Sequence, residues 1–319
     1  MKAYPRRMVC GVALAAAVAL WGGGVPADAQ TVYRTGQSVQ PVFEGWSQNT
    51  DGTFTMWFGY LNRNYEERPH IPVGPNNHFA PGPVDRGQPT HFYPRRQNFL
   101  FGVTVPADWG DKDLVWTMSH KDQVYTAIGS LWATWAVDEG VWRANRGAGL
   151  GGRTGKEAYA NQPPTIRVVG DDRVTAMVGE EVTLRVTASD DGRPGPQPER
   201  ASRPRRGYDP LPNDLPTFGG RRSGAASGIG GPTDQNMVKV RAAYETGLAV
   251  TWLHYRGPGE VTFGSMVSPV ELQDGEAATS VHFSEPGIYV VRAAADDGSF
   301  ASSADVTVTV GGGVSRVRR

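Results

Sequence analysis

Apolar and polar residues alternate with a period of two along much of the chain between residues 42 and 139. In "GTFTMWFGYL", Trp57 lies on one face of the predicted strand and four apolar residues share the other, namely Phe54, Met56, Phe58 and Tyr60. The runs "NFLFGVTVP", "DLVWTMSH" and "QVYTAIGSL" follow, with "SHKDQ" as a hairpin connection. Because this period is typical of half-buried strands, the pattern predicts a β-sandwich of about seven strands over residues 30–142.

Two segments break this pattern. The stretch "RPHIPVGPNNHFAPGPVDRGQPTHFYP" carries many prolines, which cannot occupy a central strand, so we expect a long irregular loop there. Residues 143–162, "RANRGAGLGGRTGKEAYANQ", are rich in glycine and show little apolar periodicity. They predict a flexible linker between two domains.

A second set of short runs rich in valine and threonine follows the linker. These runs are "TIRVV", "RVTAMV", "EEVTLRVTAS", "LAVTWLHY", "EVTF", "AATSVHF", "GIYVVRAA" and "ADVTVTV". Their spacing is typical of a Greek-key sandwich. Residues 193–236 are rich in Pro, Gly and Arg with few apolar anchors, so they predict a disordered insertion, and residues 311–319 form a basic tail.

Specific motifs recur within residues 163–310. They are a "PP" entry, "VTLRVTASDDG", a central Trp strand, "GPGEVTF", "FSEPGIYVVR" and a closing "DVTVTV". With them the segment resembles the immunoglobulin-like domains of the polycystic-kidney-disease (PKD) type found in exported bacterial proteins. The resemblance implies that Tyr289 forms a tyrosine corner and that Trp252 is the buried tryptophan of the third strand. Val291 stands where antibody domains carry a disulfide cysteine, so packing alone would hold this domain.

The predicted fold class is therefore all-β, with two β-sandwich domains, of which the C-terminal one is an immunoglobulin-like, PKD-type Greek key. Composition agrees, because 41 glycines and 24 prolines among 319 residues indicate many turns. Lys plus Arg equals Asp plus Glu at 32 each, so no net field favours nucleic acid or an anionic membrane. We expect no nucleic-acid partner.

Residues 1–29 have the pattern of a signal peptide. Lys2, Arg6 and Arg7 precede the apolar stretch "MVCGVALAAAVAL", and Ala27-Asp28-Ala29 supplies small residues at the cleavage positions. We therefore expect export to the periplasm or the cell exterior, with no transmembrane segment after cleavage. The only cysteine, Cys10, lies in this segment, so the mature chain would form no disulfide.

Two acidic turns are candidates for a metal site. Asp190-Asp191-Gly192 follows the second strand of the C-terminal set, and Asp296-Asp297-Gly298 follows the sixth. In an immunoglobulin-like sandwich both loops emerge at the end that faces the linker. A Ca²⁺ ion, which takes six to eight oxygen ligands, is the one cofactor that we consider for these four carboxylates. The alternative is that Asp and Gly serve only as turn residues.

Tryptophans are concentrated in the N-terminal part and are candidates for carbohydrate stacking. Trp57, Trp109 and Trp116 are the predicted ligand-binding residues, with Trp57 first because it lies opposite an apolar face. The alternative is that these rings fill the sandwich core, where each is worth about 2 to 3 kcal/mol.

No catalytic residues are predicted. A G-x-S-x-G elbow and a phosphate-binding G-x-x-x-x-G-K-[ST] loop are both missing from the sequence, and the mature chain has no thiol. We therefore expect a non-catalytic binding, adhesion or scaffold protein that recognises a polysaccharide or an envelope protein. The alternative is a glycan- or peptide-processing hydrolase, or an accessory subunit of one, because paired carboxylates are set in space rather than in sequence.

Overall fold

Strands make up almost all of the regular structure that the computed structural model describes, which confirms the all-β prediction. The described residues are 33–138, 140–142, 160–193, 195 and 247–312. Within them, no helix is long and apolar enough to cross a membrane.

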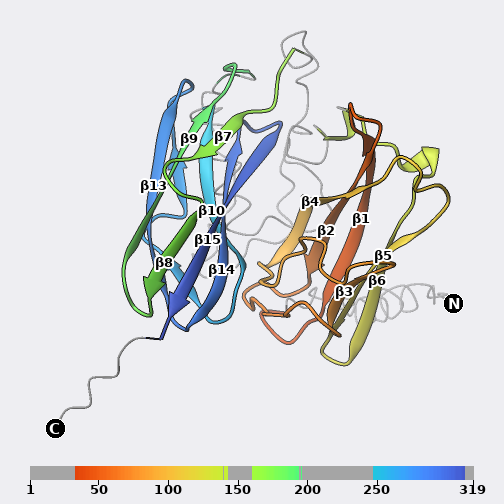
Figure 1. Cartoon of the computed structure of the whole chain (residues 1–319), viewed down its shortest axis with the longest axis horizontal. Helices are drawn as coiled ribbons and strands as arrows, with labels where there is room; N and C mark the ends of the chain where they lie inside the picture. The colour runs from red at the N-terminus through yellow and green to blue at the C-terminus, as the bar shows by residue number, and fades with distance from the viewer. Residues whose placement is uncertain (1–32, 139, 143–159, 194, 196–246, 313–319) are drawn as a thin grey trace, which may run out of the picture. The chain divides into compact units, whose positions relative to one another are not determined.

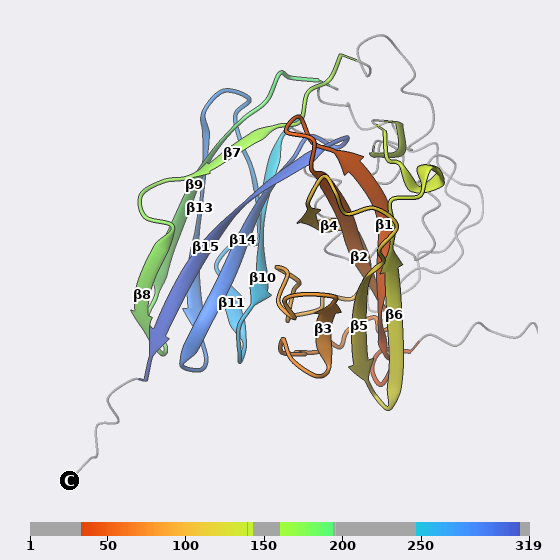
Figure 2. The same cartoon turned by 45° about the vertical axis from the view of Figure 1, so that its right-hand side comes forward.

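The N-terminal part forms two three-stranded sheets, in the orders β1-β2-β4 and β3-β5-β6 (Figures 1 and 2). All pairings within them are antiparallel. We expected about seven strands, and the described residues hold six before a 3₁₀ turn, η1 (Ala133–Trp135). The strands are β1 (Val39–Gln48), β2 (Phe54–Asn62), β3 (Asn77–Ala80), β4 (Arg95–Val105), β5 (Leu114–His120) and β6 (Gln123–Gly129).

Aromatic rings fill the space between these two sheets. Phe58 from β2 contacts Phe79 from β3 edge to face, with ring centroids 5.1 Å apart. Phe79 stacks in turn on Trp116 from β5 at 5.7 Å. The predicted hairpin between β5 and β6 is confirmed, because Lys121 and Asp122 both take positive φ angles (54° and 57°), as a tight two-residue turn requires.

The C-terminal part forms a second pair of sheets, in the orders β12-β10-β14-β15-β8 and β11-β13-β9-β7 (Figure 1). β15 and β8 pair in parallel, and the other pairs are antiparallel. This order is immunoglobulin-like, as predicted. All eight predicted strands are present, and β12 was not predicted. The strands are β7 (Thr165–Val168), β8 (Arg173–Met177), β9 (Val182–Ser189), β10 (Ala249–Arg256), β11 (Val261–Phe263), β12 (Val267–Pro269), β13 (Gly275–Phe283), β14 (Gly287–Asp296) and β15 (Ala301–Gly311).

The predicted tyrosine corner and buried tryptophan of this sandwich are confirmed. The Tyr289 hydroxyl donates a hydrogen bond to the carbonyl of Glu285 at 2.8 Å, and the residue is fully buried. Its ring lies against Gly257, which has φ +132°, and a Cβ there would overlap the ring. Trp252 is also fully buried. Packing around these two rings forms the core of the C-terminal sandwich.

Strand β10 is buried on both of its faces. One face contributes Trp252 to the C-terminal core, whereas Tyr255 belongs to the apolar cluster of the N-terminal sheets. The Tyr255 hydroxyl donates to the carbonyl of Gly87 at 2.5 Å. The Tyr255 carbonyl accepts from the backbone N–H groups of Thr90 and His91, at 3.1 and 3.4 Å. The Pro-rich loop is therefore bound to the edge of the C-terminal sandwich.

Charged side chains also contribute to the contact between the Pro-rich loop and β10. Arg256 at the end of β10 forms a two-pronged ion pair with Asp85, at 2.7 and 3.0 Å, and its Nε donates to the carbonyl of Gln88 at 2.6 Å. Arg292 from β14 pairs with Asp305 of β15 and lies 3.6 Å from the centre of the Tyr255 ring. Planar guanidinium groups suit both bidentate pairing and stacking.

The residues from Arg34 onward belong to one compact unit. The division into domains 30–142 and 163–310 stays a prediction. The predicted signal peptide (1–29) lies outside the described residues, and so do most of the predicted linker (143–162), of the predicted insertion (193–236) and of the predicted basic tail (311–319).

We predict that Tyr289→Phe lowers the free energy of unfolding by about 1 to 2 kcal/mol, because the hydrogen bond from the hydroxyl of buried Tyr289 to the Glu285 carbonyl is lost. Urea denaturation measures this change. Tyr33→Phe, at a tyrosine that is 49% exposed, is the control and should leave the midpoint unchanged. Equal midpoints for both variants would contradict a stabilising tyrosine corner.

Candidate functional site

Among the described residues, the most exposed tryptophans lie on the segment that follows β6. Trp132 is 66% exposed and Trp135 is 47% exposed, and both belong to residues 131–137, which we call the tryptophan segment. Aromatic rings of this size are normally buried, so two exposed ones within four residues make this segment the candidate binding surface.

The tryptophan segment is held along β1 by hydrogen bonds. The indole Nε1 of Trp46 donates to the carbonyl of Trp132 at 2.8 Å, and the backbone N–H of Val137 donates to the carbonyl of Trp46 at the same distance. The Trp135 ring also contacts Phe43, with centroids 5.6 Å apart. These bonds fix the backbone that carries the two exposed rings.

A glycine makes this close approach possible. The register between β1 and β2 shifts between Phe43 and Gly45, and Gly45 has φ +125°, a conformation that L side chains rarely adopt. A Cβ at this position would overlap Val137 and the carbonyl oxygen of Trp135. The bulge in β1 therefore leaves room for the tryptophan segment.

Two of the predicted stacking residues, Trp109 and Trp116, are in the core instead. Trp116 is fully buried, and its Nε1 donates to Oδ1 of buried Asn77 at 2.8 Å. Trp109 is 6% exposed, and its Nε1 donates to the carbonyl of Lys112 at 2.7 Å. Neither ring presents a face to solvent. The reason for Trp116 is visible in β5, where Leu114 and Met118 share its face and are also fully buried.

Trp57 lies on the face of β2 opposite Met56 and Phe58, as predicted, but its ring is half-buried. It meets Trp142 edge to face at 4.7 Å, and its Nε1 donates to the Ser47 hydroxyl at 2.9 Å. The structure therefore does not bring Trp57, Trp109 and Trp116 together into one exposed surface. Ligand binding by Trp57 stays a prediction.

The two acidic turns lie at the same end of the C-terminal sandwich, where the described end of the linker meets both. Asn161 Nδ2 donates to Asp297 at 3.0 Å, and the backbone N–H of Gln162 donates to Asp191 at 3.2 Å. This arrangement agrees with the expectation that both turns face the linker.

The carboxylates of these turns bind backbone N–H groups. Asp190 accepts from Gly192 and Asp191 from Arg193, and Asp296 accepts from Gly298. Asp297 accepts from Ser299 and Phe300. These are the local bonds of Asx turns, the alternative to a Ca²⁺ site. Within the described ranges, no group of three or more His, Cys, Asp or Glu side chains is arranged to hold a metal ion.

Burial changes the acidity of two of these residues. Asp190 is 6% exposed, and burial raises its pKa to about 6. Asp297 is 2% exposed, and burial raises its pKa to about 7 although three donors face its carboxylate. At neutral pH, Asp297 is therefore divided between the protonated and the ionised form.

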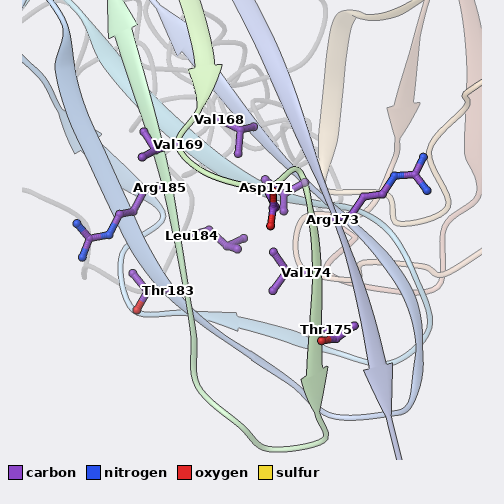
Figure 3. A pocket seen from close by; sticks show the side chains of 10 residues that line it. Val168, Val169, Asp171, Arg173, Val174, Thr175, Thr183, Leu184 and Arg185 are labelled. Atoms are coloured by element: carbon purple, nitrogen blue, oxygen red, sulfur yellow. The ribbon is translucent and has the colours of Figure 1, made fainter.

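A hollow of about 370 Å³ opens between β8 and β9, where the chain crosses from one sheet to the other (Figure 3). Leu184 and Val174 line its apolar part, and Arg173 and Arg185 lie at its rim. Arg185 is already paired with Glu276 at 3.0 Å. The hollow follows from the crossing of the chain, and its side chains form no catalytic arrangement.

The raised pKa of Asp297 predicts a pH-dependent stability. The folded carboxyl titrates near 7 and the unfolded one near 3.8. The contribution of protonated Asp297 to the free energy of unfolding is therefore fully present below pH 3.8 and is lost as the pH rises through 7. Asp297→Asn cannot ionise, so it does not show this loss. The difference in the free energy of unfolding between the variant and the wild type should therefore rise by on the order of 2 to 3 kcal/mol as the pH rises from about 5 to 8. The free energy of unfolding in urea at each pH measures it.

The matched control is Asp191→Asn, at an exposed carboxylate of the same end. It should show the pH dependence of the wild type. Parallel stability curves for Asp297→Asn and the wild type would contradict the assignment.

No family model matches the chain, and no curated protein matches it. Solved structures that it resembles include the eight N-terminal immunoglobulin domains of the Down syndrome cell adhesion molecule, with 8% identity and a TM-score of 0.22, covering 86% of this chain and 27% of that one. Domains 4 and 5 of the S-layer protein SbsC show 11% identity and a TM-score of 0.21, covering 63% and 65%. The D00-D0 domain of intimin shows 8% identity and a TM-score of 0.22, covering 85% and 100%. At these TM-scores the likenesses carry no argument about family or function, and the immunoglobulin-like fold rests on the strand order.

Proposed function

We propose that this chain is an exported, non-catalytic binding or adhesion protein, and that the tryptophan segment binds a carbohydrate. The observation that carries the proposal is the exposure of Trp132 and Trp135 on a backbone that β1 holds in place. Indole rings offer a broad apolar face, and a ring fixed before binding loses little entropy on contact with a ligand.

The rest of the structure suits a scaffold. The contact between β10 and the Pro-rich loop joins the two pairs of sheets through hydrogen bonds, an ion pair and buried rings. The tryptophan segment on one pair of sheets is thereby linked to the C-terminal sandwich. Such a body suits a spacer or adhesion module, in which binding rather than turnover is the function.

Export and the PKD-type assignment belong to the same proposal. The pattern of residues 1–29 supports a signal peptide, and the motifs of residues 163–310 support a PKD-type domain. The protein would then act in the periplasm or outside the cell, where polysaccharides and envelope proteins are both available.

The alternative, a hydrolase or an accessory subunit of one, predicts release of product. The exposed tryptophans fit either role, because glycan-processing proteins also need to hold their substrate. The two functions therefore differ in turnover and not in retention.

The test is retention of the protein on insoluble cell-wall and plant polysaccharides, combined with a reducing-sugar assay. Replacing both Trp132 and Trp135 by Ala should weaken retention by roughly 5- to 150-fold, because two aromatic contacts worth about 0.5 to 1.5 kcal/mol each are lost. The unfolding midpoint should fall only slightly, since both side chains are largely exposed and Trp135 loses its contact with Phe43.

Ile288→Ala is the matched control, because Ile288 is 65% exposed and lies on β14, outside the tryptophan segment. It should keep full retention. Retention that survives the double replacement would refute the tryptophan segment as the carbohydrate site, and product release by the wild type would favour the hydrolase. Binding to an envelope extract but to no polysaccharide, lost with the tryptophans, would identify a protein ligand instead.

A further inference from the structure

Two histidines meet where the Pro-rich loop contacts β10. His91 comes from the loop and His254 from the strand, and their rings stack with centroids 4.4 Å apart and planes 23° apart. His254 is 2% exposed, whereas His91 is half-buried. Nδ1 of His91 and Nε2 of His254 are buried, and neither has a hydrogen-bond partner in the described part of the chain. A second proton on either ring would therefore create a positive charge beside a buried nitrogen that has no hydrogen-bond partner.

Neighbouring cations oppose such a charge, whereas the backbone of Arg256 and Gly257 favours it at His254. Arg68 and His70, from the loop before β3, both act against protonation of His91, and His70 acts against protonation of His254. Two tyrosine rings complete the surroundings, Tyr93 at 5.1 Å from His91 and Tyr289 at 5.6 Å from His254. Among the described residues, Glu285 is the one carboxylate with an electrostatic effect on this cluster, and it favours protonation of His70.

Burial lowers the pKa of both histidines, because it disfavours the charged imidazolium. The pKa of His91 falls to about 3 and that of His254 to about 4, and the positive neighbours add to the effect. Burial also lowers the pKa of His70. At neutral pH the two stacked rings are uncharged.

Backbone bonds across the contact surround the two rings. The N–H of His254 donates to the Tyr93 hydroxyl at 2.9 Å, and the N–H of Gly257 donates to the Thr90 hydroxyl at 3.1 Å. The N–H of His91 donates to the carbonyl of Tyr255. A movement that lets water reach the buried His254 imidazole must break several of these bonds together.

We propose that His91 and His254 form an acid-sensitive latch, which holds residues 85–93 on β10 while both rings are neutral and releases them when either ring takes up a proton. The proposal does not depend on the ligand of the tryptophan segment. Its consequence is that acid separates the Pro-rich loop from the C-terminal sandwich before the sandwich itself unfolds.

The sign of the effect follows from linkage. Above pH 6.5, neither the closed nor the open state binds a proton at these rings. As pH falls from 6.5 through the closed-state values near 4 and 3, the open state binds more protons, so the closed state loses stability. At pH 5, each histidine that becomes free to ionise favours the open state by roughly 30-fold.

Hydrogen exchange of the full chain, followed by mass spectrometry at pH 7.5 and pH 5.0, tests the latch. Peptides covering residues 85–93 and 250–257 report the amides of Thr90, His91, His254 and Gly257. After correction for intrinsic rates, their protection should fall at least tenfold at pH 5.0. Protection of β13 should change less than twofold.

The double variant His91→Phe with His254→Phe keeps two stacked aromatic rings that cannot ionise, so its protection should not respond to pH. His282→Phe, at a half-exposed histidine of β13 that pairs with Glu181, should respond like the wild type. Unchanged protection in the wild type at pH 5.0, or an equal loss in the double variant, would overturn the latch.

A second measurement covers the case in which the double variant does not fold. Ring resonances in NMR spectra of the wild type should show the pair titrating with apparent pKa values below 5, together with loss of the loop amides. Titration near pH 6.5 while residues 85–93 stay protected would show that the rings ionise without opening, and the latch would be excluded.

Discussion

The burial of β10 on both faces is the constraint on which the rest of the structure depends. A strand at the surface of a sandwich can leave one face in water, but Tyr255 places its ring in the N-terminal cluster and its hydroxyl on Gly87. Buried polar groups must be hydrogen-bonded, so the Pro-rich loop has to supply partners for the Tyr255 carbonyl and for Arg256. The irregular course of that loop is therefore a requirement of the strand that it covers.

Much of the fold could be predicted because alternation is a local signal. "DLVWTMSH" and "GIYVVRAA" became β5 and β14, and the position of Tyr289 was enough to expect its corner. The joint at β10 could not be predicted in the same way. "LAVTWLHY" has apolar residues on both faces of the strand, which is typical of a strand buried on both sides. The pattern does not identify which segment covers the second face. The covering loop lies about 160 residues away in sequence, as the bond between Tyr93 and His254 shows.

The candidate site was less predictable, because exposure depends on tertiary packing. The neighbours of Trp116 in β5, Leu114 and Met118, already indicated an inward-facing ring. Trp132 and Trp135 lie outside any alternating run, and their exposure depends on the bulge at Gly45, which no local pattern marked. The acidic turns were placed at the correct end by topology alone. Their bonds to backbone N–H groups then favoured the turn interpretation over convergence on a cation.

Two buried titratable sites in this molecule respond to pH in opposite directions. Acid charges His91 and His254 at the contact of β10 with the loop, whereas it neutralises Asp297 at the linker end of the C-terminal sandwich. A fall in pH therefore weakens the joint while it strengthens the sandwich. Since stability is not uniform across a structure, the chain has the means to open at one contact without losing its cores. The proposed latch would therefore release residues 85–93 from β10 and leave the immunoglobulin-like sandwich intact.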